Sequence, residues 1–504
     1  MNLFERVIST PDEVAVDDLT RTRTWAELLD RATRLAHVLR DTWGVTPGEH
    51  VASIFDNRVE WFELSLATMF AGAWLVPVNT HLQRDEVEYV LADARARVVV
   101  CDEAHAELAR GVATAPVVLV GAELDALIEQ ADDTPCNGDA PPGGRMHYTS
   151  GTTGRPKGVK RDLPATVDDY VALLGSLGRA VGLDGSGPHL LTGPHYHAAV
   201  GGYALFDLVN GASVVMMAKF DAAQVLELID RHRIAHTHLV PTMMVRLLRL
   251  PDQQRRGFRG DSLTYVMHGA APIAPETKVA MIDWWGPVLT EYWGTSEAGT
   301  FTVISSTEGL AHPGSVGRAL PGVEVIAVDD HDARVPAGTI GTLYCRTGAS
   351  PRPFHYHDDP AKTDGTYLEP GLFTMGDMGR IDADGYVYLA DRATNMIISG
   401  GVNIYPAEVE VALGGHPAVA DVAVFGIPDD EWGEQVKAAV ELAPGFTASE
   451  TLERDLIAFA RERLAHYKAP KSIDFTEALP RLPSGKLATR TLKDPYWQER
   501  DRRI

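Results

Sequence analysis

One stretch, Tyr148-Thr-Ser-Gly-Thr-Thr-Gly-Arg-Pro-Lys-Gly158, restricts what this chain can fold around more than any other. Its glycines let the backbone turn tightly and bring N–H groups close to an anion, and its hydroxyls add donors. Lys157 adds a compact positive charge suited to a phosphate. The stretch predicts a phosphate-binding loop, although Gly, Ser and Thr also make flexible surface loops. The residues expected to bind are Thr149, Ser150, Gly151, Thr152, Thr153, Gly154 and Lys157.

This loop differs from the Walker A loop of P-loop kinases. That motif requires G-x-x-x-x-G-K followed by Ser or Thr. Here Pro156 precedes Lys157 and Gly158 follows it, which argues against a P-loop kinase. Residues 145–148, which lead into the loop, are expected to form a short strand.

Apolar patterns on both sides of the loop predict an α/β fold. Residues 24–39 have apolar positions at helical spacing, with Thr24 as the N-cap. Strands alternate with helices before the loop and again over residues 160–290, which is typical of parallel pairing. Residues 121–145 are polar and rich in Pro and Gly, and residues 141–144 predict a loop that leads into the phosphate loop. The strands expected first are residues 50–55, 74–78 and 97–101, with helices at 57–73 and 85–92.

The character of the sequence changes from about residue 310. Short strands and turns follow one another, which predicts a small β-rich subdomain at about 310–394. Beyond Asn395, helix and strand patterns predict a separate α+β module, residues 396–504. We therefore expect an α/β protein with a large N-terminal domain, residues 1–394, and a smaller C-terminal domain.

Composition narrows the function. The 504 residues carry a net charge of −23, which disfavours nucleic-acid binding because phosphate backbones need stripes of Lys and Arg. The cysteines (Cys101, Cys136 and Cys345) are scattered, so we expect neither a disulfide framework nor a zinc site. No apolar run has the length of a signal peptide or a membrane span. These features predict a cytoplasmic protein without an integral membrane segment.

A second candidate site is Tyr292-Trp-Gly-Thr-Ser-Glu297, which follows an expected strand at residues 287–290. An aromatic ring beside a glycine turn can stack on a purine. A nearby carboxylate can hold Mg²⁺ together with substrate phosphates. The alternative is a junction between strand and loop in which Trp293 packs in the core.

Two further stretches carry a single polar side chain in a turn. Asp377, in Phe373-Thr-Met-Gly-Asp-Met-Gly379, can accept both hydroxyls of a ribose or can form an Asx turn. Lys486 lies in the Pro/Gly-rich residues 479–490, where a solvated loop lysine is the alternative.

Taken in order, these stretches resemble the motifs of the adenylate-forming superfamily, which contains acyl-CoA synthetases, peptide-synthetase adenylation domains and firefly luciferase. Residues 149–158 are similar to its phosphate loop, residues 292–297 to its Y-G-x-T-E motif, and Asp377 to the Asp of its T-G-D motif. The resemblance covers nearly the whole chain. Besides the loop, it implies that ATP or AMP is bound by Gly269, Ala270, Ala271, Pro272, Glu291, Tyr292, Trp293, Gly294, Thr295, Ser296, Asp377, Arg392 and Lys486.

The resemblance also implies two half-reactions. A carboxylic acid and ATP give an acyl-adenylate with release of pyrophosphate, and the thiol of CoA then displaces AMP. The C-terminal domain is expected to be mobile and to rotate about a hinge at Asn395. The expected catalytic residues are Lys486, Glu297 and Lys157, with Glu297 as the Mg²⁺ ligand, and the CoA path is expected at Ser399, Gly400 and Gly401.

Several positions depart from the family pattern. Ser296 replaces the usual Thr, and Met375 interrupts the T-G-D motif. Near the hinge, Thr394, Asn395 and Ile398 stand where Lys or Asp is common, which leaves the electrostatics of the hinge open. The Ile-Ile-Ser-Gly-Gly sequence at the hinge is like the acyl-CoA synthetase branch.

Pro194-His-Tyr-His197 resembles the family's P-x-F-H stretch beside the acyl pocket. A metal pair and simple strand packing are the alternatives for such an H-x-H sequence, and no third ligand at metal spacing is evident. The residues expected to line the acyl pocket are His197, Gly201, Gly202, Tyr203, His238, His268 and Thr300.

The resemblance favours a CoA ligase for a fatty acid, with an aromatic or steroid-type acid next. An amino acid is disfavoured because no lone acidic residue is placed to bind an α-amino group. The alternatives are an acyl-AMP ligase that feeds a carrier protein and an inactive ATP-binding scaffold. An insertion near the hinge, expected of the first, is not evident. Lys486, Glu297 and Asp377 argue against the second. A homodimer stays open.

Overall fold

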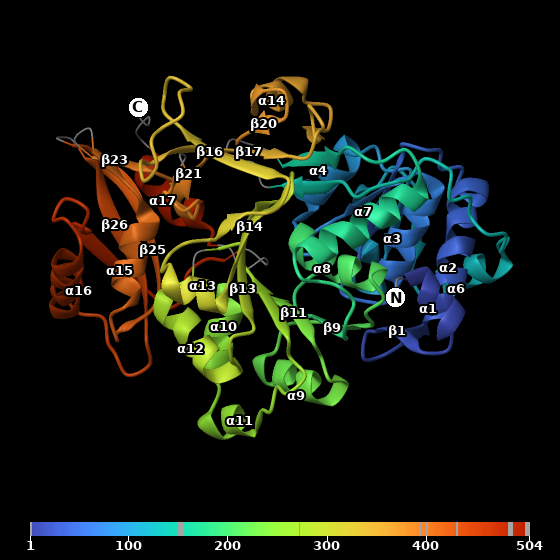
Figure 1. Ribbon diagram of the computed structural model, residues 1–504, viewed down its shortest axis with the longest axis horizontal. Coiled ribbons are helices and arrows are strands. Elements are labelled where there is room, and N and C mark those ends of the chain that lie inside the picture. Colours follow the sequence, from blue (N-terminus) through green and yellow to red (C-terminus); the bar gives the residue numbers. More distant parts are fainter. Residues whose placement is uncertain are drawn as a thin grey trace.

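The computed structural model describes residues 3–149, 156–271, 273–392, 395–399, 402–429, 432–481 and 487–498, and at residues 391, 392 and 403 the backbone alone. Figure 1 shows the first elements (blue) on one side and the C-terminal elements (orange to red) on the other. The green and yellow elements lie between them.

The first layer is a four-stranded parallel sheet in the order β4 (Trp74–Pro77), β3 (His50–Ile54), β5 (Val98–Cys101) and β6 (Val117–Leu119). Its strands are almost wholly buried, as expected of a parallel sheet covered by helices. The strands expected at residues 50–55, 74–78 and 97–101 are confirmed.

The second layer is a nine-stranded sheet whose inner strands are parallel and whose edges are antiparallel. Parallel strands bring their carboxyl ends to one edge, where α/β proteins bind ligands. The order is β15 (Arg318–Ala319), β14 (Gly299–Ser305), β13 (Leu289–Thr295), β12 (Tyr265–His268), β11 (His236–Leu239), β9 (His189–Leu191), β10 (Val214–Met216), β1 (Val14–Asp17) and β2 (Thr22–Thr24).

Helices cover these sheets. Thr24 caps the second helix as expected, since its hydroxyl accepts the N–H of Glu27, whose carboxylate accepts the N–H of Thr24 in return. The helices are α1 (Leu3–Ser9), α2 (Trp25–His37), α3 (Glu60–Ala71), α4 (Arg84–Asp93), α5 (Ala106–Val112), α6 (Ala122–Gln130), α7 (Val167–Ala180), α8 (Ala198–Val209), α9 (Ala222–His232), α10 (Pro241–Leu248), α11 (Asp252–Gly257), α12 (Pro275–Trp285) and α13 (Ser306–Ala311).

The first part of the polar stretch at residues 121–145 forms α6, while the loop predicted at residues 141–144 is confirmed as a segment without helix or strand. Leu124 and Ile128 lie four residues apart and are both buried, so one face of this short helix packs on the core.

The β-rich subdomain is confirmed as an antiparallel sheet, with β16 (Val323–Val328), β17 (Gly341–Thr347), β19 (Tyr367–Glu369), β20 (Leu372–Phe373), β21 (Asp377–Ile381) and β22 (Val387–Arg392). From the same region, β18 (Phe354–Tyr356) pairs with β8 (Lys157–Arg161), which pairs with β7 (His147–Thr149). The phosphate-loop hairpin therefore belongs to a sheet that the β-rich region completes. A short helix, α14 (Pro360–Asp364), follows β18.

The C-terminal module has its own sheet and core. Helix α15 packs against the long β25 and β26 hairpin, and buried residues such as Val409, Val424 and Leu456 form the core. The elements are β23 (Ile397–Ser399), β24 (Val402–Ile404), α15 (Pro406–Gly414), β25 (Val419–Asp429), β26 (Gly433–Leu442), α16 (Glu450–Arg463), β27 (Ser472–Thr476) and α17 (Thr489–Trp497).

Helix α3 is buried along its whole length, and its first turn carries two carboxylates. Glu63 has no exposed surface and binds Arg23 at 2.6 Å and Arg31 at 2.7 Å. Glu60, 1% exposed, binds Arg21 and Arg58, both at 2.8 Å. The carboxylates lie at the positive end of the helix dipole, which adds to the stabilisation.

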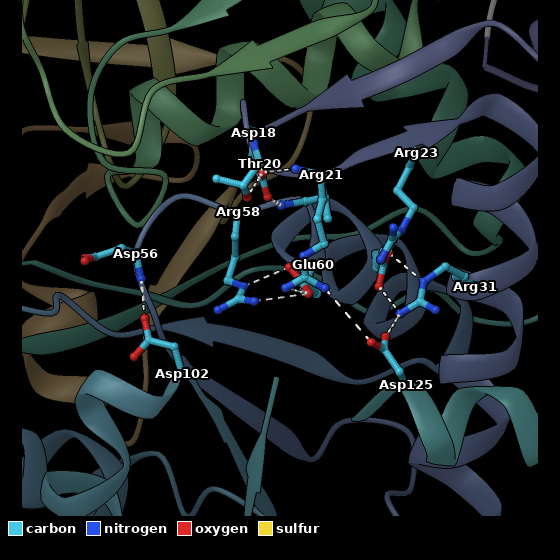
Figure 2. A network of polar contacts seen from close by, with 12 residues as sticks. Asp18, Thr20, Arg21, Arg23, Arg31, Asp56, Arg58, Glu60, Asp102 and Asp125 are labelled. Carbon is cyan, nitrogen blue, oxygen red and sulfur yellow. Dashed lines mark hydrogen bonds and ion pairs between the residues drawn. The ribbon is translucent and has the colours of Figure 1, made fainter. Parts of the chain in front are cut away.

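Figure 2 shows that these pairs form one region of alternating charge. The carboxylate of Asp125 in α6 forms an ion pair with the guanidinium of Arg31 at 2.5 Å. The carboxylate of Asp18, after β1, accepts the backbone N–H of Val59, just before α3. In the same view the N–H of Asp56 donates to Asp102, which follows β5. Residues from both sheets thus hold the start of α3.

Among the helices that the structure describes, none combines the length and the apolar composition needed to cross a bilayer.

We expect Glu63→Ala to lower the free energy of unfolding by about 3–5 kcal/mol, because it leaves two buried guanidinium groups around an empty position. Urea denaturation followed by tryptophan fluorescence measures the loss. Glu13→Ala is the matched control, since Glu13 forms an exposed pair with Arg6 at 3.3 Å. That change is expected to cost less than about 1 kcal/mol. Equal effects of the two changes would contradict a central role for the Glu63 cluster.

Buried histidines make the stability depend on pH. Burial lowers the pKa of His50, His195, His238 and His268 to about 3. An unfolded histidine titrates near pH ~6.5, so below that pH the unfolded chain binds protons that the folded chain does not. The stabilisation is complete above about pH 6.5 and is lost progressively as the pH falls towards about 3.

We expect His268→Gln to flatten the dependence of the free energy of unfolding on pH, because one proton fewer is taken up on unfolding. The slope should fall by at most about 1.4 kcal/mol per pH unit in the acid range. Urea unfolding at a series of pH values from neutral to mildly acid measures it. An unchanged slope would mean that His268 is protonated in the folded protein.

Candidate active site

A large cleft lies between the sheets of the N-terminal part, the β-rich subdomain and the C-terminal module. Its volume is about 3110 Å³, and it is lined from all three parts of the chain. Its walls include Thr149 at the phosphate loop, Glu297 and Asp377, and Tyr405 and Lys468 of the C-terminal module. Stretches that lie far apart in the sequence therefore meet in one place.

Helix α4 holds both stems of the predicted phosphate loop. The hydroxyl of Tyr148, before the loop, donates to Asp93 at 2.7 Å. The hydroxyl of Tyr89 donates to the carbonyl of Pro156, after the loop, at 3.0 Å. The two stems are therefore tied to one rigid element.

Thr149 and Lys157 face each other across the β7–β8 hairpin. The ammonium group of Lys157 lies 3.4 Å from Asp359, whose carboxylate also caps α14 by accepting the N–H of Lys362. The N–H of Lys362, together with the Lys157 ammonium, lowers the pKa of Asp359. Lys157 is not part of the cleft wall. Because its ammonium group is paired with Asp359, a phosphate that binds Lys157 would have to compete with the Asp359 carboxylate.

The stretch from Tyr292 to Glu297 forms the end of β13 and the turn into β14. We expected it to follow a strand, but β13 itself continues to Thr295 and pairs antiparallel with β14. The strands approach closely at Gly294, where a Cβ would lie 2.3 Å from the carbonyl oxygen of Gly299. A side chain at this position would push the hairpin apart.

Arg161 of β8 holds the turn of this hairpin. It donates to the carbonyl of Ser296 at 2.9 Å and to that of Glu297 at 3.1 Å. The Glu297 carboxylate, 8% exposed, lies in the cleft wall and accepts the hydroxyl of Tyr356 at 3.3 Å. Among the described residues no basic side chain forms a salt bridge with Glu297, and no set of three or more His, Cys, Asp or Glu could hold a metal ion.

Trp293 connects two of the motifs. Its indole N–H donates to Asp377 at 3.0 Å, and its ring packs edge-on against Phe301 with the centroids 5.0 Å apart. Both Trp293 and Asp377 line the cleft, so Trp293 is a packing residue and a wall residue at once. In the β21–β22 pairing Asp377 lies opposite Arg392, whose side chain is outside the described part.

The loop after β12 lies on the same wall. Ala270 and Ala271 line the cleft, and Ala270 has φ +67°, a left-handed conformation that costs a residue with a Cβ about 1–2 kcal/mol. Gly269 lies behind the wall, because a Cβ there would lie 2.6 Å from the ring of Tyr292. Glu291 reaches the cleft, but its carboxylate is bound by Lys278 at 2.7 Å.

An aromatic group forms the wall on the side predicted for the acid. Tyr203 and Thr300 share a hydrogen bond of 2.8 Å, and His238 contacts the Tyr292 hydroxyl at 3.2 Å. The rings of Tyr203 and Tyr292 meet edge to face at 5.3 Å. His238 is neutral at ordinary pH because of its lowered pKa. His197 and Gly202 line the same cleft, as do Tyr203, His238 and Thr300.

Two residues expected in the acyl pocket lie behind its wall. A Cβ on Gly201 would lie 2.2 Å from the carbonyl oxygen of His195 and 2.8 Å from the Trp61 ring, so this glycine lets α8 pack against α3. His268 has no exposed surface and is not part of the cleft wall. Both residues were expected in the pocket from their positions in the sequence. In the fold, Gly201 is enclosed by its neighbours and the His268 side chain is buried away from the cleft.

Part of the expected site falls outside the described residues: Ser150, Gly151, Thr152, Thr153, Gly154, Pro272, Gly400, Gly401 and Lys486. At the predicted hinge, Asn395 lines the cleft, and Ser399 ends β23 opposite Gly433 of β26.

The sequence did not point to several residues that complete the site. Arg161, Tyr356 and Asp359 reach it from β8, β18 and α14, and only the pairing of β18 with β8 brings these elements together. Arg145 lines the cleft just before the phosphate loop. The signal for it was an arginine at the start of a predicted short strand that leads into the phosphate loop, where a positive charge can lie close to the site.

The fold and the cleft define a nucleotide-dependent enzyme with a large N-terminal part and a small C-terminal module. The AMP-binding enzyme family model matches residues 3–350, and the model of its C-terminal domain matches residues 408–486. The chain belongs to the AMP-binding enzyme family. The resemblance to adenylate-forming enzymes is therefore confirmed, and the protein is an enzyme of this superfamily.

Three similar proteins illustrate the range of the family. A feruloyl-CoA synthase of an Amycolatopsis species is 34% identical, over 96% of each chain. The fatty acid–[acyl-carrier-protein] ligase ScoC of Streptomyces coeruleorubidus is 32% identical, over 96% of this chain and 93% of that one. The structure of ATP-bound MatB from Rhodopseudomonas palustris has a TM-score of 0.86 at 29% identity, over 98% of this chain and 99% of that one.

We expect Trp293→Phe to raise the KM for ATP by about 5- to 20-fold, because it removes one hydrogen bond to a charged group at the predicted ribose site. Pyrophosphate release at varied ATP concentration measures the change. Trp432→Phe is the matched control, since Trp432 is 47% exposed and lies outside the cleft wall. An unchanged KM for ATP in Trp293→Phe would mean that Asp377 does not bind the nucleotide.

Proposed function

We propose that the protein is an AMP-forming acid–thiol ligase that joins a carboxylic acid to coenzyme A. The observation that carries this proposal is the cleft itself. The Trp293–Asp377 pair, Glu297 and the stems of the phosphate loop line the same cleft as the aromatic side chains Tyr203 and Tyr292. The order and spacing of the motifs support the same function.

In the first half-reaction, a carboxylate oxygen of the acid attacks the α-phosphorus of ATP. The new P–O bond forms as the bond between the α- and β-phosphates breaks, and pyrophosphate leaves. Negative charge gathers on the phosphoryl oxygens in the transition state, so positive donors aimed at them lower the barrier. We assign this role to Lys486. The phosphate loop and Lys157 would bind the β- and γ-phosphates, which leave as pyrophosphate.

Glu297 fits the ligand of a Mg²⁺ ion that binds together with ATP. Mg²⁺ prefers oxygen ligands and takes few from protein when phosphates supply the rest. The Glu297 carboxylate lies in the cleft wall and is held by a neutral hydroxyl, that of Tyr356. Bound Mg²⁺ neutralises phosphate charge.

In the second half-reaction, the thiol sulfur of CoA attacks the carbonyl carbon of the acyl-adenylate. A C–S bond forms, the bond from the carbonyl carbon to the phosphate oxygen breaks, and AMP leaves. We propose that the C-terminal domain, residues 396–504, rotates about Asn395 between the halves, withdrawing Lys486 and bringing Ser399, Gly400 and Gly401 to the thiol. A hinge of few residues is a common device for such a step.

A fatty acid is our first candidate substrate, followed by an aromatic or steroid-type acid. The aromatic wall formed by Tyr203, Tyr292 and His238 suits either class. Relatives named for a fatty acid and for ferulate support both. A transfer to the thiol of a carrier protein rather than CoA is the second candidate function, favoured by the name of the ScoC relative. A cytoplasmic location and a homodimer stay predictions.

We expect Lys486→Ala to slow adenylation by about 100- to 1000-fold, because one charged donor to the transition state is lost. Thioester formation from supplied acyl-adenylate should be nearly unchanged. Single-turnover assays of each half-reaction separate the two. Lys471→Ala is the control, since Lys471 is a partly exposed lysine of the same module paired with Asp429. Equal losses in both halves would overturn the role of Lys486.

Pyrophosphate release over a panel of carboxylic acids, with ATP and Mg²⁺ and with or without CoA, tests the function directly. AMP and acyl-CoA formed only when CoA is added would support the CoA ligase. Acyl-adenylate without a CoA thioester would favour transfer to a carrier protein. No release with any acid, despite ATP binding, would favour an inactive ATP-binding protein.

A further inference from the structure

The partly buried arginines of this chain differ in their partners. Arg23, Arg31 and Arg58 are each bound to a buried carboxylate of α3. Arg145 is different, because its Nη1 is buried and has no hydrogen-bond partner among the residues that the structure describes. A buried guanidinium without an acceptor costs stability, so its presence calls for an explanation.

Arg145 is one of the residues that line the cleft. Its Nη2 would lie only 3.9 Å from a Cβ on Gly202 of α8, which lines the same cleft. Tyr170 of α7, which acts electrostatically on Arg145, lines the same cleft. Helix α8 also carries Tyr203 of the aromatic wall in the predicted acid pocket.

The surroundings of Arg145 are electropositive. The charged or ionisable groups that act on it are Tyr170 and a second cleft arginine, Arg161. Burial lowers the pKa of Arg145, and Arg161 lowers it further. Arg161 in turn binds neutral carbonyl oxygens, those of Ser296 and Glu297. The Glu297 carboxylate also acts on Arg161, whereas no carboxylate is among the groups that act on Arg145, so the Arg145 guanidinium suits an anion.

The anion that fits is a group other than the phosphates of ATP. Arg145 precedes Thr149, where the phosphate loop begins, by four residues of extended chain, or about 13 Å. Its side chain reaches α8 at Gly202 instead. The reacting carboxylate must approach the α-phosphate, so a group bound between Arg145 and Gly202 would belong to the remote part of the acid.

We propose that the acid used by this enzyme carries a second carboxylate, remote from the reacting one, that pairs with the guanidinium of Arg145. This inference rests on the proposed ligase function and narrows it to dicarboxylic acids. A guanidinium offers two parallel N–H donors that match a carboxylate. Gly202 leaves the space for it, since any side chain there would cover the arginine.

The test compares length-matched acids: adipic with hexanoic, suberic with octanoic, sebacic with decanoic, and 3-(4-carboxyphenyl)propanoic with 3-phenylpropanoic acid. Pyrophosphate release with ATP, Mg²⁺ and CoA gives kcat/KM for each. In the wild type we expect the diacid to be preferred in at least one pair. A preference for the monoacid in every pair would overturn the inference.

Arg145→Met keeps the length of the side chain and removes its charge. We expect the ratio of kcat/KM for the diacid over the monoacid to fall by about 10- to 100-fold, as for the loss of a charge-assisted pair. Arg145→Lys should restore part of the ratio. An unchanged ratio in Arg145→Met would overturn the inference. Arg179→Met is the matched control, because Arg179 of α7 is bound to Asn210 and lies outside the cleft wall.

A second variant guards against a folding defect in Arg145→Met. Gly202→Asp places a carboxylate beside Nη2 of Arg145 and should also abolish the preference for the diacid. Retained preference there would count against the proposal. Activity on monoacids without any diacid preference overturns this inference alone. Absence of turnover with every acid, with ATP still bound, overturns the ligase function as well.

Discussion

The buried carboxylates at the start of α3 are the interaction on which the N-terminal part depends. Helix α3 is enclosed on all sides, so Glu60 and Glu63 are tolerable only because arginines from β2, α2 and the neighbouring loops neutralise them. Such a cluster adds little net stability compared with apolar packing, but it is directional. It sets the position of α3 relative to the sheets, which apolar contacts alone would leave free to slide.

The same region positions the cleft. Asn57, three residues before α3, donates to the carbonyls of Gly193 and Met217, and its side-chain oxygen accepts the N–H of His195. The turn that carries His197 into the cleft is therefore held by the residue that leads into α3. A second tie runs through Gly201, whose lack of a side chain lets α8 approach Trp61. The acid side of the cleft thus depends on packing at α3.

Much of the site could be predicted from the sequence, because local motifs carry local chemistry. The phosphate-loop stems, the β13–β14 turn and Asp377 were identified from glycine turns beside single polar residues, and all of them line or adjoin the cleft. The contacts between motifs could not be predicted. The hydrogen bond from Trp293 to Asp377 joins residues 84 positions apart in the sequence, and the hydrogen bond from Arg161 to the carbonyl of Glu297 joins residues 136 positions apart. No spacing rule acts over such separations.

The sequence by itself determined the class of the protein, its alternation of strands and helices, and the residue types that meet a nucleotide, because turns, caps and apolar periods are encoded over a few neighbouring positions. The tertiary structure alone decided which side chains reach the cleft. It placed His268 and Gly201 in the packing behind the wall, and it left Nη1 of Arg145, a residue of the cleft wall, without a hydrogen-bond partner among the described residues. The direction of a side chain depends on what packs against its element, and in this chain those neighbours come from distant parts of the sequence.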